Sequence, residues 1–354
     1  MVKQNQQTII GYIGTYTKGN SKGIYRFTLD TVEGKISTPV LAAELTDPTY
    51  ITISEDNKHL YAILKEAGSG GVSAYSINED SSDLTYLGKQ LTPNGSSCHV
   101  SIDSEKHILV TSNYGDGIIE AYQLQKDATP LPVSSTIRHE GKGPNKDRQE
   151  KAHTHFAGFT PDEKFIAVVD LGIDKVITYK IHNGVLEEVH SLSVAPGSGP
   201  RHLTFHPNGK FAFVMAELVP EVIVLSYDSL NGRFSELQTV RTVPEDFSEN
   251  NQGSAIHISA DGHFVYAANR GHDSIAVFQT DHATGNLTLV ELVSTEGHWP
   301  RDFAIDPSGR FLVASNEESG NLTLYSRNES TGKLTLLQKD VQVPFPVCVK
   351  FLQG

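Results

Sequence analysis

Short stretches of alternating apolar and polar residues run along nearly the whole chain, and turn residues separate them. The stretch GPRHLTFHPNGKFAFVMAEL, residues 199–218, shows the pattern, because two short apolar runs flank the tight turn HPNG. Alternation with a period of two residues is typical of half-buried β-strands, and Gly, Pro and Asn mark the turns between them. The chain shows no long helical periodicity. The sequence therefore predicts an all-β protein.

The strand–turn–strand unit recurs at intervals of about 50 residues. Its copies are DPTYITISEDNKHLYAIL, SSCHVSIDSEKHILVTSN, HTHFAGFTPDEKFIAVVD, GPRHLTFHPNGKFAFVMAE, GSAIHISADGHFVYAANR and WPRDFAIDPSGRFLVASNE. A third strand follows each copy, as in KVITYKI and EVIVLSY, and a fourth follows a turn such as NGR, TGN or TGK. Repeats of this length with four strands each are typical of a β-propeller in which every repeat forms one blade.

The two ends of the chain hold the parts of one further blade. FPVCVKF near the C-terminus has the pattern of a first strand, while IIGYIGTYT and GIYRFTL near the N-terminus have the patterns of a second and a third. Joining them closes the ring and removes the exposed sheet edges of an open array. We therefore expect residues 1–354 to form a single domain, a seven-bladed β-propeller with four antiparallel strands per blade, closed by strands from both termini.

Composition and charge limit the classes of function. No apolar run approaches the length of a membrane span, and the N-terminal sequence lacks a secretory signal. Two cysteines, Cys98 and Cys348, have no metal or redox spacing, which favours a reduced, cytoplasmic setting. The formal net charge of −13 argues against a nucleic acid or an anionic membrane as a partner. The oligomeric state stays open, with a homo-oligomer among the alternatives.

Aligning the copies on their turns gathers charged residues at one mouth of the central channel. In a propeller the first strand of each blade lines the channel and the second runs back beside it, so the start of one and the end of the other share a mouth. The positions at the start of the first strands are Thr49, Cys98, His155, Arg201, Ser254, Arg301 and Val347. The positions at the end of the second strands are Lys65, Asn113, Leu171, Glu217, Arg270 and Glu317.

One histidine, three arginines and a glutamate break the repeat at these positions, and an acidic protein that gathers cations at a concave site is suited to bind a small anionic substrate. Asp170, Asn269 and Asn316 come one residue before the ends of second strands, where we expect them to orient the charged groups. His202, next to Arg201, is either a structural histidine or a secondary residue of the site. The channel mouths of propellers also hold polar side chains that have no catalytic or binding role. The prediction of a binding site therefore depends on the histidine, the three arginines and the glutamate taken together.

A long basic insertion, RHEGKGPNKDRQEKAHTH, precedes the first strand of the His155 blade and enters at the same mouth. It is either a solvated loop or a rim that helps to hold a phosphate group. Within it, His153 and His155 have the alternate spacing that places two side chains on one face of a strand, as a metal site would need. No carboxylate or cysteine completes a ligand set nearby in the sequence. We expect no metal and no cofactor, and assign His153 to substrate binding.

Several segments resemble the seven-bladed propeller lactonases. These are GPRHLTFHPNGKFAF, AEL, PEDFS, AIHISADGHFVYAANR and PRDFAIDPSGRF, and the resemblance extends from GTYT near the start to VCVKF at the end. The family includes the bacterial propeller-type 6-phosphogluconolactonases, and the fungal carboxy-cis,cis-muconate cyclases are related to it. The site of those cyclases pairs a histidine, arginines and a glutamate. By this resemblance the roles carry over to His155, Arg201, Glu217 and Arg270.

The resemblance implies hydrolysis of a sugar lactone, foremost 6-phospho-D-glucono-1,5-lactone, to the open acid in the oxidative pentose phosphate pathway. A neutral His155 would accept a proton from water, and Arg201 would stabilise the oxyanion. Glu217 would hold Arg201 or His155 in place, or itself act as the base. Arg270 or Arg301 would bind the phosphate in a forked contact.

Two other functions stay open at this point. The first is a cycloisomerase acting on a carboxylated muconate, since that reaction also interconverts a lactone and an anionic acid. The second is a propeller that binds a ligand or a partner without catalysis, because the fold alone does not establish an activity. The charged positions at the mouth speak against the second alternative.

Overall fold

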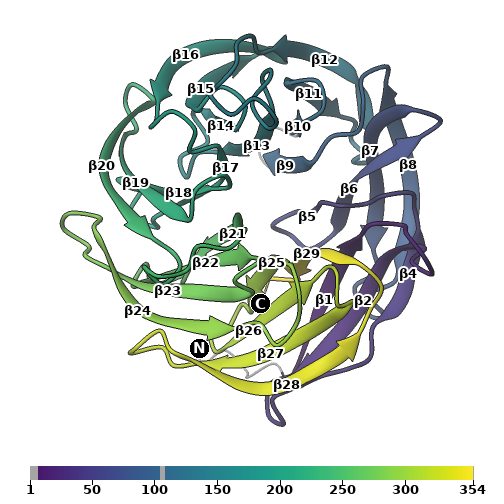
Figure 1. The fold of residues 1–354 in the computed structure, drawn as a ribbon. Coiled ribbons are helices and arrows are strands. Elements are labelled where there is room, and N and C mark those ends of the chain that lie inside the picture. Colours follow the sequence, from purple (N-terminus) through teal and green to yellow (C-terminus); the bar gives the residue numbers. More distant parts are fainter. Residues whose placement is uncertain (1–6, 104–107, 354) are drawn as a thin grey trace.

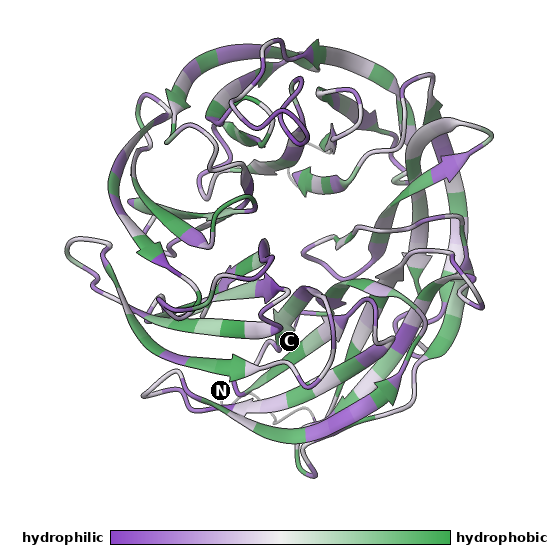
Figure 2. Ribbon diagram, in the orientation of Figure 1, coloured by the Kyte–Doolittle hydropathy of each residue, from purple (hydrophilic) through white to green (hydrophobic). Residues whose placement is uncertain are grey.

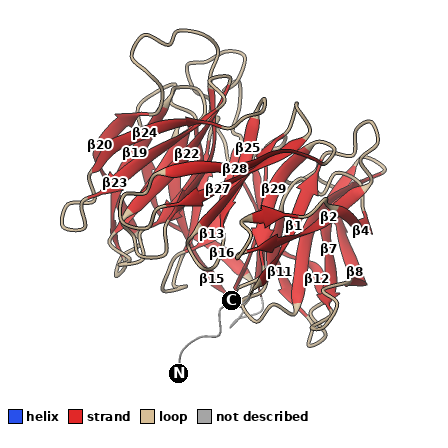
Figure 3. Cartoon of the chain, turned by 90° about the horizontal axis from the view of Figure 1, so that it is seen from below, coloured by secondary structure: helices blue, strands red, loops and turns tan. Residues whose placement is uncertain are grey.

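Seven antiparallel sheets stand in a ring around a central channel (Figure 1). The computed structural model describes residues 7–103 and 108–353, and every regular element within them is a strand (Figure 3). The all-β, seven-bladed propeller expected from the repeats is therefore confirmed. None of the described segments forms a helix with the length and apolar character that crossing a membrane requires.

Six blades follow one another along the chain, each with its strands in sequence order from the channel outward. Their strands are β5 (Ile51–Ile53), β6 (His59–Glu66), β7 (Ser69–Ile77) and β8 (Leu84–Thr92); β9 (His99–Asp103), β10 (Ile108–Asn113), β11 (Ile118–Leu124) and β12 (Pro130–Arg138); β13 (Thr154–Phe159), β14 (Ile166–Asp170), β15 (Lys175–His182) and β16 (Val185–Ser193); β17 (Pro200–Phe205), β18 (Phe211–Ala216), β19 (Glu221–Asp228) and β20 (Arg233–Arg241); β21 (Gln252–Ile258), β22 (Phe264–Arg270), β23 (Ser274–Thr280) and β24 (Leu287–Ser294); β25 (Pro300–Ile305), β26 (Phe311–Asn316), β27 (Asn321–Arg327) and β28 (Leu334–Gln342).

The remaining blade joins the two ends of the chain. C-terminal β29 (Pro346–Phe351) is the inner strand and pairs with β1 (Thr8–Thr15), which pairs with β2 (Gly23–Asp30). The outer strand is divided into β3 (Lys35–Ile36) and β4 (Val40–Glu44), both paired with β2. Pro39 lies in the gap between them and has no N–H to offer the ladder. The predicted closure is confirmed, with a broken fourth strand in this blade.

The hydrophobic core lies between neighbouring sheets. In β18, Phe213 and Met215 pack toward the β21–β24 blade, while Ala212 and Val214 pack toward the β13–β16 blade. Successive side chains of a strand point to opposite faces, so a strand buried on both faces tends to form a nearly continuous apolar run. This explains the unbroken apolar run of β18. The outermost strands have one face exposed and show mixed colours in Figure 2.

Candidate active site

β-bulges present the three key side chains of the inner strands. In β13 the residues on either side of His155 pair with adjacent positions of β14, so His155 itself is left out of the ladder. The same register shift leaves Arg201 out of the β17–β18 ladder and Arg301 out of the β25–β26 ladder. A bulge inserts one extra residue into a strand and re-aims its side chain. His155, Arg201 and Arg301 are therefore each carried by an irregularity of the sheet.

The bulges allow consecutive residues to line one cavity at the mouth, although side chains of a regular strand alternate between faces. Arg201 and His202 both line it, as do Arg301 and Asp302. The cavity is lined by Tyr16, Thr49, Tyr50, Cys98, His155, Arg201, His202, Arg301, Asp302 and Val347. The alignment of first strands thus predicted six of these residues, and Ser254, the seventh position, contributes a backbone carbonyl to Arg201.

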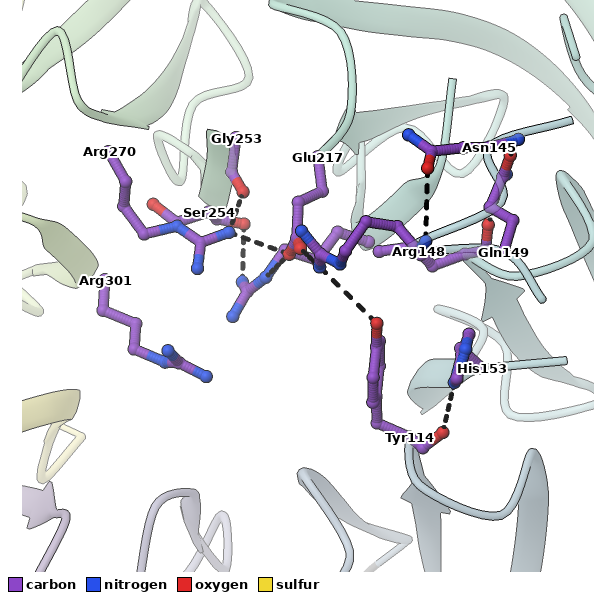
Figure 4. A network of polar contacts seen from close by, with 12 residues as sticks. Tyr114, Asn145, Arg148, Gln149, His153, Glu217, Gly253, Ser254, Arg270 and Arg301 are labelled. Carbon is purple, nitrogen blue, oxygen red and sulfur yellow. Dashed lines mark hydrogen bonds and ion pairs between the residues drawn. The ribbon is translucent and has the colours of Figure 1, made fainter. Parts of the chain in front are cut away.

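Glu217 is buried among three guanidinium groups (Figure 4). Its Oε2 lies 3.0 Å from Nε of Arg201 and accepts a 2.8 Å hydrogen bond from Nη2 of Arg270, while Nη2 of Arg148 binds Oε1. Burial by itself would raise the pKa of Glu217, but the charges of Arg270 and Arg201, with further help from Arg148, hold that pKa far below its usual range. The carboxylate therefore stays ionised and is a poor proton acceptor at neutral pH.

Backbone carbonyls fix the two buried arginines. Nη1 of Arg201 donates to the carbonyl of Ser254 at 2.7 Å, and Nη2 of Arg270 donates to that of Gly253 at 2.7 Å. A Cβ at Gly253 would lie 2.0 Å from the carbonyl oxygen of Ala216, so only glycine allows this close approach of the two blades. Burial, followed by the charge of Arg270, lowers the pKa of Arg201 to about 9, which still leaves Arg201 charged at neutral pH.

A second carboxylate lies on the other side of the mouth. Nη1 of Arg301 donates to Oε2 of Glu317 at 3.2 Å, and Nζ of Lys18 is 3.7 Å from Oε1 of the same residue. The guanidinium of Arg301 also lies over the ring of Tyr16, 5.2 Å from its centroid. Within the described residues, the ion pairs of the mouth thus join five cationic side chains to two carboxylates, in a protein with a net charge of −13. The local excess of positive charge suits an anionic ligand.

Two buried imidazoles complete the reactive part of the cavity. The rings of His155 and His202 lie 5.2 Å apart between centroids. Nδ1 of His155 and Nε2 of His202 are buried, and neither has a hydrogen-bond partner among the described residues. Burial, with the charge of Arg201 as a further cause, lowers the pKa of both histidines well below 6.5. Both rings are therefore neutral at pH 7, and each offers a nitrogen to a bound molecule.

Sequence reasoning missed Tyr50 and His99. The ring of His99 lies 4.3 Å from that of Tyr50 and 5.7 Å from that of His202, so the three form an aromatic wall in the channel. Each of them follows directly after an aligned mouth position, as His202 follows Arg201. Reading the next position of every repeat would have found them.

The insertion between β12 and β13 lies beside the mouth and is fixed by buried polar contacts. Nε2 of Gln149 donates to the carbonyl of Leu171 at 2.8 Å and to Oδ1 of Asp174 at 2.7 Å. At its start, Nδ1 of His139 lies 2.7 Å from a carboxylate oxygen of Asp170. The insertion is therefore anchored beside the mouth by Gln149 and His139, although most of its residues are exposed to solvent.

Four residues that the sequence placed at the site, three to orient charged groups or contact substrate and one to bind it, have other partners. Asp170 accepts hydrogen bonds from the backbone N–H groups of His153 and Gly172. The side chain of Asn269 bonds to Thr242, and that of Asn316 donates to the carbonyl of Thr295. These contacts tie strand ends to the loops between blades.

His153 is the fourth of these residues. Its Nδ1 is 2.7 Å from the carbonyl of Tyr114, its Nε2 is 3.2 Å from Glu150, and its ring stacks on that of Tyr114. None of the four residues is among those that line the cavity. Asp170, Asn269 and Asn316 each come one residue before a mouth position, and alternation along the strand directs successive side chains to opposite faces.

No three His, Cys, Asp or Glu side chains within residues 7–103 and 108–353 lie together in an arrangement that would hold a metal ion. The ring nitrogens of His153 are engaged by Tyr114 and Glu150, as described above, and His155 points into the cavity. The spacing of the two histidines thus does not produce a shared site.

Comparison with known proteins places these features in a family. The family model described as "Lactonase, 7-bladed beta-propeller" matches residues 10–351. A 6-phosphogluconolactonase of Bacillus subtilis (strain 168) is 54% identical over 343 residues, which cover 97% of this chain and 98% of that protein.

Two solved structures also match this chain over nearly its whole length. A crystal structure of a protein from Lactobacillus plantarum matches with a TM-score of 0.94 and 39% identity, covering 98% of this chain and all (100%) of that one. The periplasmic gluconolactonase of Pseudomonas aeruginosa matches with a TM-score of 0.91 and 29% identity, covering 98% of this chain and 99% of that one.

Proposed function

Because the chain belongs to the seven-bladed β-propeller lactonase family, we propose that it is a 6-phosphogluconolactonase, which hydrolyses 6-phospho-D-glucono-1,5-lactone to 6-phosphogluconate. The assignment of this substrate rests on the 54% identity, over nearly the full length of both chains, to the enzyme of that name. The cationic mouth supports it, because a phosphorylated lactone is an anion. We assign the reaction to the oxidative pentose phosphate pathway and the protein to the cytoplasm, where its two free cysteines would stay reduced.

Opening a lactone requires an attacking water, a proton acceptor and stabilisation of the carbonyl oxygen. His155 supplies the acceptor, since its buried ring is neutral at pH 7 and its Nδ1 is free to bind the water. Water attacks the carbonyl carbon and gives its proton to His155, which leaves a tetrahedral oxyanion. The bond from that carbon to the ring oxygen then breaks, and the ring oxygen takes the proton from His155 to become a hydroxyl. The new carboxylic acid ionises and releases one proton to solvent.

Arg201 stabilises the oxyanion. Its Nε faces Glu217 and its Nη1 is bound to the Ser254 carbonyl, so the guanidinium is held rigidly at the edge of the cavity with Nη2 left for the substrate. A donor that is already oriented costs no reorganisation when negative charge develops. Glu217 is a positioning residue in this proposal, because three arginines use its carboxylate and keep it ionised.

Arg301 and His202 contact the lactone itself, since both line the cavity with Arg201 and His155. Arg270 does not line it and acts through Glu217, to which it donates. Six-membered lactones also open in water without a catalyst, so the site needs to supply only part of the large accelerations known for other enzymes. A site without a serine nucleophile is sufficient for this chemistry.

The test is a pH-stat assay with freshly generated 6-phosphogluconolactone, because each turnover releases one proton. The rate without enzyme is subtracted at every substrate concentration. Proton release that is proportional to enzyme supports the proposal, and a rate equal to the spontaneous one contradicts it. A parallel assay with a carboxylated muconate separates hydrolysis from cycloisomerisation.

A further inference from the structure

Of the three guanidinium groups on Glu217, only one is open to solvent. The side chains of Arg201 and Arg270 are 3% and 4% exposed, whereas that of Arg148 is 32% exposed. Figure 4 shows Arg148 reaching Glu217 from the insertion, on the side away from Arg270. An incoming anion therefore meets Arg148 before it meets the two buried arginines.

Glu217 does not depend on Arg148 for its charge compensation. Arg201 and Arg270 both remain on its Oε2 when Arg148 leaves Oε1. A buried carboxylate that keeps two cationic partners is not left unpaired. The contact between Arg148 and Glu217 can thus be exchanged for one with a ligand at small cost.

The backbone beside Arg148 is well fixed. Gln149, the next residue, is fully buried and bonded to Leu171 and Asp174, and Asn145 Oδ1 accepts a hydrogen bond from the N–H of Arg148. The hydroxyl of Tyr114 lies 3.5 Å from Nη2 of Arg148. Only the end of the arginine side chain has to move to change partners.

We propose that Arg148 leaves Glu217 to bind the phosphate of the substrate, and that it thereby makes the enzyme select phosphorylated over unphosphorylated lactones. This proposal rests on the lactonase function proposed above. A dianionic phosphate is costly to bury, so the carbonyl end of the substrate enters toward Arg201 and the phosphate end stays at the rim. Arg201 and Arg148 hold opposite oxygens of one carboxylate, so a single small substrate can reach both. Arginine also matches the forked geometry of a phosphate.

The experiment compares kcat and KM on 6-phosphogluconolactone and on glucono-1,5-lactone for the wild-type protein, Arg148→Gln and Arg148→Lys. Arg148→Gln should lower kcat/KM for the phosphorylated lactone by about tenfold to a hundredfold, as the loss of a charged hydrogen bond does, mainly through KM. Its kcat/KM for glucono-1,5-lactone should change less than about threefold, since that substrate has no phosphate. Arg148→Lys should keep part of the preference, because it keeps the charge without the fork.

Lys146→Gln is the matched control, since it removes one charge from the same exposed insertion. It should leave kcat/KM for both lactones unchanged. Arg301→Gln should lower kcat/KM for both lactones by a similar factor, because Arg301 lines the reaction cavity. Equal losses on the two lactones with Arg148→Gln, or no loss on either, would overturn the proposal for Arg148.

A wild-type protein that opens neither lactone would sink the proposed function separately. In that case, titration calorimetry with 6-phosphogluconate tests whether Arg148 binds the phosphate, independently of any activity. Weaker binding by Arg148→Gln than by Lys146→Gln and the wild type supports the phosphate contact, and equal binding overturns it.

Discussion

Nε of Arg201 lies 3.0 Å from Oε2 of Glu217, with both side chains almost fully buried. The arginine is the bulged residue at the start of β17, and the glutamate follows the last residue of β18. The strands that flank the turn HPNG thus bring to one point two charges that are 16 positions apart in the chain. The pair holds the guanidinium of Arg201 in a fixed position in the site.

Replacing Arg201 should abolish most of the lactonase activity. Arg201→Ala removes the donor proposed for the oxyanion, and the loss of one such donor lowers kcat by about a hundredfold to a thousandfold. The ring of blades should survive, because Glu217 keeps Arg270 and Arg148. Steady-state kinetics and a thermal melt check both points, with Lys210→Ala, on the exposed turn before β18, as a surface control. Wild-type turnover by Arg201→Ala would remove this residue from the mechanism.

Glu217→Gln should lower the free energy of unfolding. Proton transfer should continue, because His155 is the proposed acceptor. The substitution leaves Arg201 and Arg270 buried side by side without a counter-charge, and breaking a buried pair costs about 3–5 kcal/mol. Urea unfolding at pH 7 measures this loss. The double variant Glu217→Gln with Arg270→Met should recover part of it, because one uncompensated charge is gone.

The stability that Glu217 contributes also has a defined pH dependence. The pKa of Glu217 in the folded protein lies below that of an ordinary glutamate, so its contribution is fully present above the unfolded-state pKa near 4.5. It is lost as the pH falls toward the folded-state value. The difference in unfolding free energy between wild type and Glu217→Gln should therefore shrink as the pH is lowered from 5 to 3. A constant difference over this range would contradict the paired role of the carboxylate.

His155 should control the pH profile of the reaction. Its neutral form accepts the proton, and its pKa lies well below 6.5, so kcat should stay level as the pH falls from 8 through 6.5 and decline only in more acidic solution. His155→Gln keeps a polar side chain but should lower kcat by about a hundredfold or more. His153→Gln is the matched control two residues away, whose side chain points out of the cavity. An acid limb centred at pH 6.5 would show that an ordinary imidazole sets the rate.

Removing β29 should abolish cooperative folding. Its buried side chains Cys348, Val349 and Phe351 pack in the cores that join the closing blade to its two neighbours, and Val347 lines the cavity. Each buried apolar side chain contributes about 1.5–3 kcal/mol, and the set approaches the whole stability of about 5–15 kcal/mol that domains have. A chain ending after Val343 should lack a thermal transition by circular dichroism. A chain that loses only residues 353 and 354 should melt near the wild-type temperature.

The amino-acid pattern alone determined the architecture. A period of two residues within strands and a period of about 50 between repeats leave little choice but a ring of four-stranded blades. The split of the closing blade between β29 and β1 followed in the same way, because unpaired sheet edges at both ends would otherwise face solvent. The alignment of repeats also placed His155, Arg201 and Arg301 at one mouth.

The tertiary structure decided which side chains meet in the cavity. The bulges in β13, β17 and β25 put His155, Arg201 and Arg301 into it, and a register shift of one residue leaves no mark in a strand pattern. The backbone N–H groups of His153 and Gly172 engage the carboxylate of Asp170 outside the cavity. The approach of Arg148 to Glu217, across 69 positions of sequence, depends on how a buried glutamine fixes the insertion. Contacts between distant segments arise from packing in three dimensions, and local periodicity carries no information about them.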